Sequence, residues 1–318
     1  MVGNAVIWLI LLLLTVGAGW LAWRAWRARP ALLKWGGTVL AGLLTLVLAL
    51  LTSVSGLGMV KFYTPRQAPQ RTVALANTPE QVARGEHLAN TFCASCHSPS
   101  GDLPLSGGLD VGKDIPIPLG SFVSANLTPG GPLAEWTDAD IFRAIRYGVA
   151  PSGQNLTIMS GARGRYLSDS DIEALVAYIR SQPAVDNPTL NPPDQPSLLG
   201  FIMVGVGMLP NGAPFIEGEL TAPALSATAE YGEYILTYQD CRDCHGEDLR
   251  GGVEGQLAPV GPDLALVKGW TAEQFITTMR TGVDPSGHAI QPPMPWQYIG
   301  RMTDEELTAA YLYLQSLP

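Results

Sequence analysis

Two short motifs contain the residues of this chain that could do chemistry. Residues 93–97 read Cys-Ala-Ser-Cys-His and residues 241–245 read Cys-Arg-Asp-Cys-His. C-x-x-C-H is the attachment signature of c-type haem, in which two thiols add to the vinyl groups of one porphyrin and the histidine ligates its iron. The two motifs therefore predict two covalently bound haem c groups, with His97 and His245 as proximal ligands. They use every cysteine of the chain: Cys93, Cys96, Cys241 and Cys244.

A C-x-x-C pair without the histidine is also found in zinc sites and in thiol redox centres. Here the pair occurs twice, each time with a histidine directly after it, and no cysteine remains for a disulfide. Haem attachment is therefore the preferred interpretation, and zinc binding and thiol redox chemistry remain the alternatives.

Methionine is the usual sixth ligand of an electron-carrying c haem, opposite the proximal histidine. The region around the first motif, residues 71–183, contains a single methionine, Met159, which we assign to the first iron. The region around the second motif contains three. We assign Met294 to the second iron because prolines flank it and prevent a helix there. Met279 and Met302 lie in or beside helical patterns, where methionine is usually a core filler.

Two other histidines are rival ligands. His288 lies six residues before Met294, so a second haem with two histidine ligands stays open as an alternative. His87 precedes Cys93 on the same predicted helix. A surface or hydrogen-bonding role is the preferred interpretation of both side chains.

Charge is divided unevenly along the chain. The net charge is −9, but all 28 Asp and Glu residues follow residue 71, together with only 12 of the 19 Lys and Arg residues. The part from residue 72 onward therefore carries a net charge of −16. Such a field disfavours nucleic acid and anionic surfaces and favours a basic protein partner, although a soluble surface without a specific partner has the same charge.

Two uncharged, apolar stretches open the chain. Residues 1–23 and 35–60 contain no charged side chain, and each is long enough to cross a bilayer as a helix at about 1.5 Å per residue. The loop between them is basic and is bracketed by tryptophans, as in an interfacial aromatic belt. Its four cations are Arg24, Arg27, Arg29 and Lys34. Cationic loops stay cytoplasmic, so everything after Lys61 is predicted to lie outside the cytoplasm.

This topology agrees with haem attachment, which in bacteria takes place outside the cytoplasmic membrane. We therefore predict a multi-pass protein of the cell membrane with its haem domains on the periplasmic or extracellular side. A cleaved signal peptide is the alternative. However, the first stretch lacks a basic n-region, and both apolar runs are long for a signal.

The rest of the chain repeats itself. Residues 136–153 match residues 270–287 at a constant shift of 134, and after the methionine loops the shift is 135. Such self-similarity indicates two copies of one domain, each with helices around a haem. We predict an all-α protein with five segments: a two-helix transmembrane anchor at 1–62, a juxtamembrane linker at 63–78, a haem domain at 79–183, an inter-domain linker at 184–222 and a second haem domain at 223–318.

Capping residues mark where helices of the first repeat begin. Thr78 followed by Pro79 predicts the start of the helix that leads to Cys93. Thr137 and Ser168 predict two further starts.

The inter-domain linker contains an apolar, glycine-rich segment at residues 198–209 that is too short to span a bilayer. It could pack between the two haem domains, lie on the membrane surface or dock a partner. We expect packing, because an exposed apolar patch of this size would be a liability.

From about residue 79 to the C terminus, the chain resembles tandem dihaem c-type cytochromes built from class I cytochrome c domains. It looks like the cytochrome subunits, and their membrane-anchored relatives, that take electrons from periplasmic dehydrogenases. The amino-terminal hairpin lies outside the resemblance. Five segments carry it: Gly85-Glu86, Ala125–Pro129, Gly232–Tyr234, Gly261–Leu264 and Pro292–Trp296.

The resemblance also implies a contact for the proximal histidine. A carbonyl near the position of Pro262 accepts a hydrogen bond from this histidine, which fixes the ring and tunes the iron. The first repeat has Ala125 at the corresponding place.

Electron transfer is the predicted function, because an iron with both axial positions filled has no place for a substrate. The chain would relay electrons between a dehydrogenase or respiratory complex and another redox protein, with a basic docking face on the partner. The alternative is an oxidoreductase acting on peroxide or sulfur compounds, which would need an open or unusual first haem. The sequence contains no evident catalytic residue or nucleophile–base motif. A structural or sensory haem protein is a third interpretation. It is disfavoured because the tandem domains come without an output module.

Overall fold

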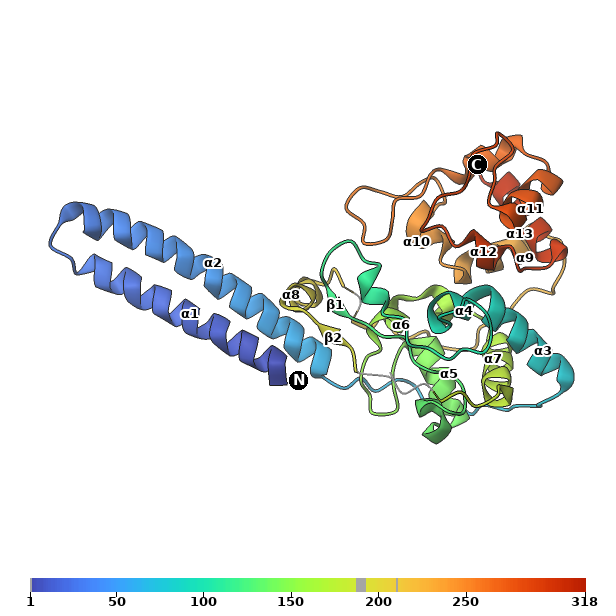
Figure 1. Ribbon diagram of the computed structural model, residues 1–318, viewed down its shortest axis with the longest axis horizontal. Helices are drawn as coiled ribbons and strands as arrows, with labels where there is room; N and C mark the ends of the chain where they lie inside the picture. The colour runs from blue at the N-terminus through green and yellow to red at the C-terminus, as the bar shows by residue number, and fades with distance from the viewer. Residues whose placement is uncertain (1, 187–192, 210) are drawn as a thin grey trace. The chain divides into compact units, whose positions relative to one another are not determined.

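The computed structural model describes residues 2–186, 193–209 and 211–318, which fold into two compact units (Figure 1). Each unit has its own internal packing. The hairpin unit comprises Met1–Arg66, Asp110–Phe122 and Pro193–Asn211. The repeat unit comprises Gln67–Leu109, Val123–Pro192 and Gly212–Pro318.

The hairpin unit contains two long helices, α1 (Val2–Trp26) and α2 (Ala31–Tyr63), packed along each other (Figure 1). Polar groups lie on the seam between them. Thr15 Oγ1 is 2.9 Å from Thr52 Oγ1, and Trp8 Nε1 donates to the Thr52 carbonyl oxygen at 3.0 Å. The outward faces are apolar, and both helices are long and apolar enough to cross a membrane. The helices coincide with the two predicted apolar spans.

The apolar segment of the linker forms α8 (Leu198–Val206), which packs on the carboxyl-terminal part of α2. The helices approach closely at Gly58, where a Cβ would lie 1.8 Å from the carbonyl oxygen of Phe201. Lys61 Nζ donates to the carbonyl oxygen of Gly205 at 2.9 Å and satisfies a terminal carbonyl of α8. The expectation that this segment packs between the two haem domains is therefore wrong. The glycines at the α2 crossing offer it a close-fitting apolar surface instead.

A two-stranded antiparallel sheet completes the hairpin unit. Strand β1 (Gly120–Ser121) pairs with β2 (Gln195–Pro196). Before β1, the short helix η2 (Val111–Lys113) is capped by the carboxylate of Asp110, which also accepts from the Phe122 N–H at 2.8 Å. Residues 110–122 thus fold with the hairpin, although the sequence places them inside the first repeat.

The repeat unit contains a similar succession of helices twice, as the sequence predicts. The first repeat consists of α3 (Pro79–Leu88), η1 (Ala89–Cys93), α4 (Ala94–His97), η3 (Pro132–Glu135), α5 (Asp138–Tyr147), α6 (Thr157–Gly161), η4 (Arg163–Tyr166) and α7 (Asp169–Ser181). The second consists of α9 (Ala229–Tyr238), α10 (Cys241–His245), η5 (Leu264–Gly269), α11 (Ala272–Thr281), α12 (Trp296–Ile299) and α13 (Asp304–Ser316).

The predicted helix starts are confirmed. Thr78 caps α3, Thr137 caps α5 and Ser168 caps α7 through their side-chain oxygens. Helix α5 and its counterpart α11 both begin with a capping box and both end at a glycine in the left-handed region. The φ angle is 61° at Gly148 and 70° at Gly282, a conformation that favours glycine. Equivalent sequence signals therefore produce equivalent helices in the two repeats.

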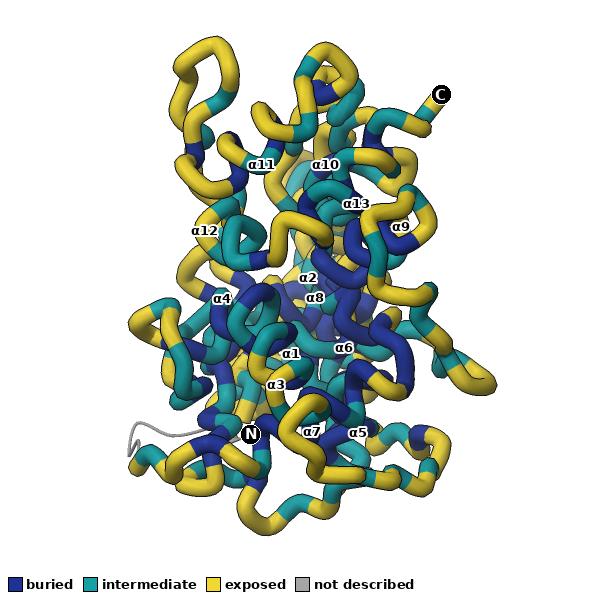
Figure 2. Tube along the Cα trace, turned by 90° about the vertical axis from the view of Figure 1, so that its right-hand side faces the viewer, coloured by how far each residue is buried: buried dark blue, intermediate teal, exposed yellow. Residues whose placement is uncertain are grey.

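The first and last helices of each repeat cross at a glycine. A Cβ at Gly85 of α3 would lie 1.9 Å from the carbonyl oxygen of Ala174 in α7. A Cβ at Gly232 of α9 would lie 2.0 Å from the carbonyl oxygen of Ala309 in α13. Nine of the thirteen residues of α7 are buried, and five of the thirteen residues of α13 are buried (Figure 2). This shared crossing fixes the helix that leads into each C-x-x-C-H motif.

Replacing Gly85 by alanine should destabilise the repeat unit by about 1–3 kcal/mol, because the added methyl group overlaps a backbone atom that cannot rotate aside. Denaturant unfolding followed by circular dichroism measures the loss. Gly269→Ala is the matched control, since a Cβ at Gly269 meets no atom within 4 Å. Equal stability of the two variants would contradict the close crossing.

Candidate haem sites

Each attachment motif lies on a short helical segment after the first helix of its repeat. This segment is continuous with that helix in the first repeat and is separated from it by Gln239 and Asp240 in the second. In the first repeat, α3 passes into η1, which ends at Cys93, and α4 carries the remaining motif residues to His97. In the second repeat, α10 contains the whole motif from Cys241 to His245. A helical C-x-x-C-H segment presents both thiols and the histidine from adjacent turns, as attachment to one porphyrin requires.

A backbone carbonyl fixes each proximal histidine. His97 Nδ1 lies 2.9 Å from the carbonyl oxygen of Ala125, and His245 Nδ1 lies 2.8 Å from that of Pro262. A carbonyl can only accept, so Nδ1 carries the proton and Nε2 keeps its lone pair for iron. Burial lowers the pKa of His97 although the hydrogen bond opposes it, and this favours the neutral, ligating ring. The carbonyl contact implied for Pro262 is present in both repeats.

The loops that follow the motifs return to them. The Gly107 N–H donates to the carbonyl oxygen of His97 at 2.7 Å, and the Gly251 N–H donates to that of His245 at 2.8 Å. Gly261 brings the backbone against the second imidazole, because a Cβ there would lie 2.7 Å from Nδ1 of His245. These contacts hold each ring in one orientation and fit a histidine that ligates haem iron.

The four cysteines are partly buried and form no disulfide. Burial, with smaller contributions from neighbouring groups, raises the pKa of the Cys93 and Cys241 thiols to about 12. Such thiols stay protonated at neutral pH, whereas a reactive redox cysteine has a lowered pKa. Within the described residues, no three His, Cys, Asp or Glu side chains are grouped in a way that could hold a metal ion. The arrangement fits haem attachment, in which each thiol becomes a thioether.

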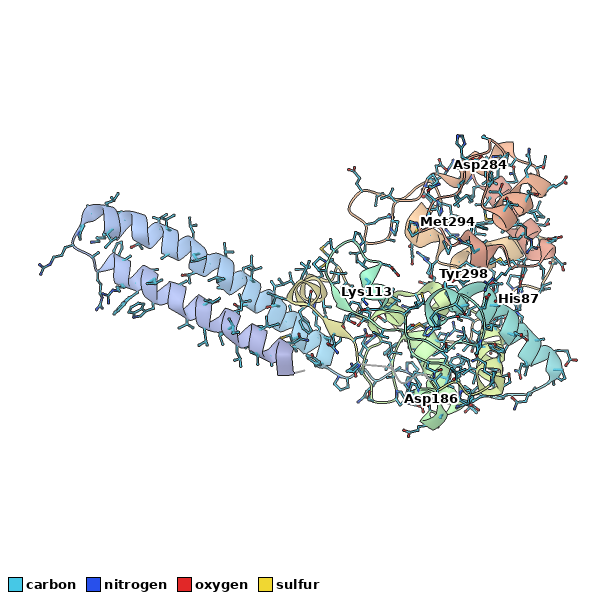
Figure 3. The ribbon with its side chains drawn as sticks, in the orientation of Figure 1. His87, Lys113, Asp186, Asp284, Met294 and Tyr298 are labelled. Atoms are coloured by element: carbon cyan, nitrogen blue, oxygen red, sulfur yellow. The ribbon has the colours of Figure 1, made fainter. Side chains whose placement is uncertain are left out.

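The structure separates the methionines into two kinds. Met279 and Met302 are only 7% and 2% exposed and belong to the hydrophobic core, which confirms their role as core fillers. Met159 lies on α6, and Met294 lies on the loop between α11 and α12 (Figure 3). Both are only partly buried, and both occupy the same place in their repeats, at a shift of 135. Their assignment to the two irons stays a prediction.

The two rival histidines have other partners. The His288 side chain is exposed and lies 3.4 Å from Asp284 in its own loop, in agreement with a surface role. His87 of α3 has its Nε2 2.6 Å from Glu306 Oε2 of α13, so it makes a hydrogen bond between the two repeats.

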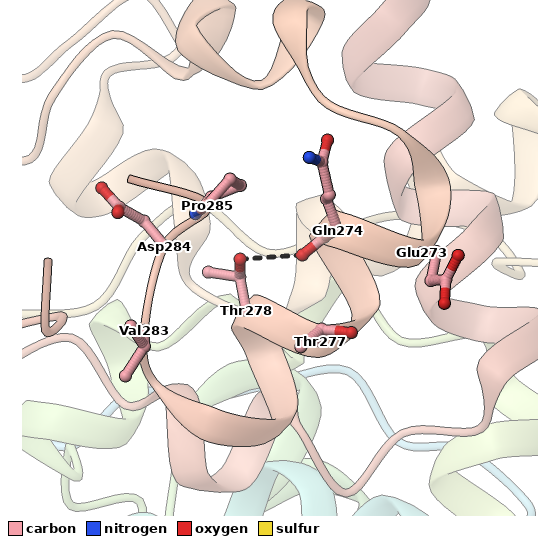
Figure 4. A pocket seen from close by; sticks show the side chains of 7 residues that line it. All are labelled: Glu273, Gln274, Thr277, Thr278, Val283, Asp284 and Pro285. Atoms are coloured by element: carbon pink, nitrogen blue, oxygen red, sulfur yellow. Dashed lines mark hydrogen bonds between the residues drawn. The ribbon is translucent and has the colours of Figure 1, made fainter. Parts of the chain in front are cut away.

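A hollow beside α11 is separate from both candidate haem sites. Thr278 Oγ1 on its wall donates to the Gln274 carbonyl oxygen at 2.8 Å (Figure 4). Its lining contains no motif residue and neither of the assigned methionines. The lining residues are Glu273, Gln274, Thr277, Thr278, Val283, Asp284 and Pro285.

Sequence reasoning missed a polar cluster where the two repeats meet. Arg84 of α3 donates two hydrogen bonds to Asp171 of α7, at 2.8 and 3.0 Å, and one to Glu306 of α13, at 3.1 Å. His87 also contacts Glu306, and the Tyr234 hydroxyl donates to Asp171 at 2.6 Å. Asp171 and Glu306 are equivalent residues at a shift of 135. An acid therefore recurs in the first turn of the last helix of each repeat. This recurrence is the sequence signal from which the cluster could have been inferred.

The pKa of Glu306 predicts how stability depends on pH. Burial would raise this pKa, but His87, the Thr303 amide and Arg84 outweigh it and hold the value at about 2. An unfolded glutamate has a pKa of about 4.3. Ionised Glu306 therefore stabilises the fold fully above about pH 4.3, and this contribution is lost as the pH falls toward 2. The melting temperature should drop over this range, and less steeply in Glu306→Gln. If the melting temperatures of the wild type and of Glu306→Gln fall in parallel with pH, other carboxylates cause the loss of stability.

Comparison with known proteins supports the same division of the chain into repeats. Residues 80–179 match the family described as cytochrome c oxidase, cbb3-type, subunit III. Residues 229–318 match the family described as cytochrome c. Two separate matches therefore cover the two regions that contain the attachment motifs.

Individual relatives include cytochrome subunits of dehydrogenases. The chain is 37% identical to the gluconate 2-dehydrogenase cytochrome c subunit of Pantoea cypripedii over 101 residues, which is 30% of this chain and 22% of the relative. It is 26% identical to the alcohol dehydrogenase (quinone) cytochrome c subunit of Gluconacetobacter polyoxogenes, over 77% of this chain and 58% of the relative. The chain thus spans less than two thirds of the length of these subunits.

A relative of similar length is the diheme cytochrome c-type protein of Cereibacter sphaeroides. It is 26% identical over 86% of this chain and 96% of the relative. This match runs across both repeats, and each repeat contains one attachment motif with a carbonyl-bound histidine. The chain therefore belongs to the dihaem c-type cytochromes: it has two cytochrome c domains, holds two haem c groups, and is similar to the cytochrome subunits of membrane-bound dehydrogenases.

Proposed function

We propose that this cytochrome relays electrons, outside the cytoplasmic membrane, between a dehydrogenase or respiratory complex and a second redox protein. Each haem supplies an iron that takes up and releases one electron. The proposal is supported by candidate ligands that are arranged alike in both domains. A carbonyl-bound histidine in C-x-x-C-H is followed, at the equivalent place, by Met159 or Met294.

The residues of the chain have distinct parts in this proposal. The hydrogen bonds from His97 to Ala125 and from His245 to Pro262 fix the rings and make Nε2 a better donor to iron. The two methionines fill the remaining axial positions and leave no place for a substrate. A protein so arranged passes electrons without binding a small molecule at its iron.

An optical redox titration of the purified protein, with and without carbon monoxide, tests the relay directly. We expect two low-spin haems that both show the sulfur-to-iron charge-transfer band and that do not bind carbon monoxide. A haem that is high-spin or binds carbon monoxide would show an open iron. That result would overturn the relay and favour an oxidoreductase.

For the electron donor we propose a dehydrogenase with a basic docking face. Two of the relatives named above are subunits of gluconate and alcohol dehydrogenases, and another relative is a fructose dehydrogenase cytochrome subunit. The net charge of −16 after residue 71 would steer a basic partner to this chain. Transfer rates should then fall as salt shortens the Debye length from about 10 Å at 0.1 M to about 3 Å at 1 M. Rates that are flat with ionic strength would exclude electrostatic docking.

We also propose that α1 and α2 anchor the protein in the cytoplasmic membrane. Their apolar outer faces support this, as do the cations stacked on tryptophans around the loop between them. Arg27 lies 4.0 Å from the Trp23 ring centroid and Lys34 lies 4.8 Å from that of Trp26. Such pairs suit the interface between headgroups and hydrocarbon.

Fractionation and proteolysis test the anchor and its orientation. The protein should stay in carbonate-washed membranes, and protease added outside spheroplasts should remove both haem domains. Release of a shortened, soluble protein would instead indicate a cleaved signal sequence.

A further inference from the structure

An arginine follows each proposed methionine ligand and contacts the opposite repeat. Arg163 lies four residues after Met159, and Arg301 lies seven residues after Met294. Each arginine binds residues that flank the haem attachment motif of the other repeat. The contacts are therefore reciprocal, although the two arginines do not occupy equivalent positions.

Three carboxylates around the second motif bind Arg163. Its backbone N–H donates to Asp240 Oδ1 at 2.7 Å, its Nε donates to Asp243, and its Nη2 donates to Glu247. Asp240 directly precedes the motif, Asp243 lies inside it, and Glu247 follows it. The Arg163 side chain is 11% exposed, whereas the side chains of Asp243 and Glu247 are 36% and 80% exposed. A buried cation from the first repeat thus lies at the attachment point of the second haem.

The contact of Arg301 with the first motif is less acidic. Its Nη1 donates to Asn90 Oδ1 and to the Gly101 carbonyl oxygen, both at 2.7 Å. Its Nη2 donates at 2.9 Å to Asp102, whose side chain is 75% exposed. The guanidinium also lies 5.0 Å from the ring centroid of Tyr298, which Figure 3 labels. Among the described residues, the second motif thus has two acids, Asp243 and Glu247, that bind a guanidinium of the other repeat, whereas the first has one, Asp102.

We propose that Arg163 is a positioning residue of the relay. It holds the Met159 segment of the first repeat on the attachment motif of the second haem, and its charge raises the reduction potential of that haem. The inference rests on the proposed relay function. Carboxylates near an iron stabilise the ferric state, which carries one more positive charge, and so lower its potential. The guanidinium offsets part of that effect, so one repeat tunes the iron of the other.

The Arg163→Gln variant of the full-length holoprotein tests this by spectroelectrochemical titration. At a fixed potential, the ferric-to-ferrous ratio of the second haem should rise about tenfold, which corresponds to about 59 mV for one electron. The first haem should shift much less. A variant with both Cys241 and Cys244 replaced by alanine retains only the first haem and so assigns the two potentials. Arg163→Lys keeps the charge and should restore most of the second potential, which a purely steric role would not predict.

The matched control is Arg280→Gln, which removes the same charge from the second repeat at an ion pair with Asp304, away from the motif. It should leave both potentials unchanged. If Arg163→Gln fails to hold two haems, Asp243→Asn decides the question, because removing an acid should raise the second potential. An unmoved second haem, or a larger shift at the first, would overturn the inference. Carbon monoxide binding by the wild-type protein would overturn the relay itself, whatever the variants show.

Discussion

In Met294→Leu, the second haem should lose its sulfur-to-iron band, bind carbon monoxide when reduced and fall in reduction potential. Leucine is close to methionine in volume but offers no ligand, so the change opens the iron without emptying the site. Axial ligands shift haem potentials within a range of roughly 0.8 V, which makes this one of the largest effects that a single residue can have. Optical spectra and a redox titration of the reduced and oxidised protein measure it.

The core methionines provide the control for this experiment. Met279→Leu and Met302→Leu change buried residues of the hydrophobic core and should leave both haem spectra as in the wild type. Met159→Leu should remove the sulfur-to-iron band and allow carbon monoxide binding at the first haem alone. If Met294→Leu retains its band, another side chain ligates the second iron. His288→Ala then tests the alternative with two histidine ligands.

Arg84→Leu should destabilise the repeat unit by about 3–5 kcal/mol, because it leaves two buried carboxylates without their shared cation. The side chains of Asp171 and Glu306 are 9% and 1% exposed, and Arg84 is the arginine that bridges them. The two acids come from different repeats, so their repulsion should also loosen the contact between the repeats. Denaturant unfolding of the holoprotein measures the free energy, and the separate absorbance of the haems shows whether both domains unfold together.

An exposed ion pair provides the comparison for Arg84. Arg280 pairs with Asp304 at 2.8 Å, but the Asp304 side chain is 77% exposed, so Arg280→Leu should cost at most about 1 kcal/mol. A loss of similar size in both variants would mean that the buried cluster contributes no more than a surface pair. Glu306→Gln in the Arg84→Leu background should recover part of the stability, since it removes one of the two carboxylates that have lost Arg84.

The two repeats contact each other through side chains at equivalent positions of their first helices. Gly85 and Gly232 mark the same helix crossing, and two positions further on are His87 and Tyr234. His87 contacts Glu306 of the second repeat, and Tyr234 contacts the equivalent acid, Asp171, of the first. Each repeat therefore offers a hydrogen-bonding side chain from its first helix to the last helix of the other. An approximately two-fold relation of this kind makes the polar contacts reciprocal.

The sequence by itself determined everything that depends on local spacing. The two C-x-x-C-H motifs, the caps at Thr78, Thr137 and Ser168, and the constant shift between the repeats needed no partner elsewhere in the chain. The two apolar helices were equally evident, because a span of that length without charge has few alternatives. Met279 and Met302 were expected in the core from their neighbourhood in the sequence, and both are buried.

Only the tertiary structure decided which distant residues meet. The sequence could not show that α8 packs on α2, because the close approach depends on Gly58 and Phe201, which lie far apart in the chain. Nor could it show that Arg163 reaches the second motif or that Arg84 bridges Asp171 and Glu306. Pairs of charged side chains do not recur at a fixed spacing in the sequence, and a hydropathy pattern does not indicate which of them meet. They form where the fold buries opposite charges side by side, since an unpaired buried charge would be too costly to keep.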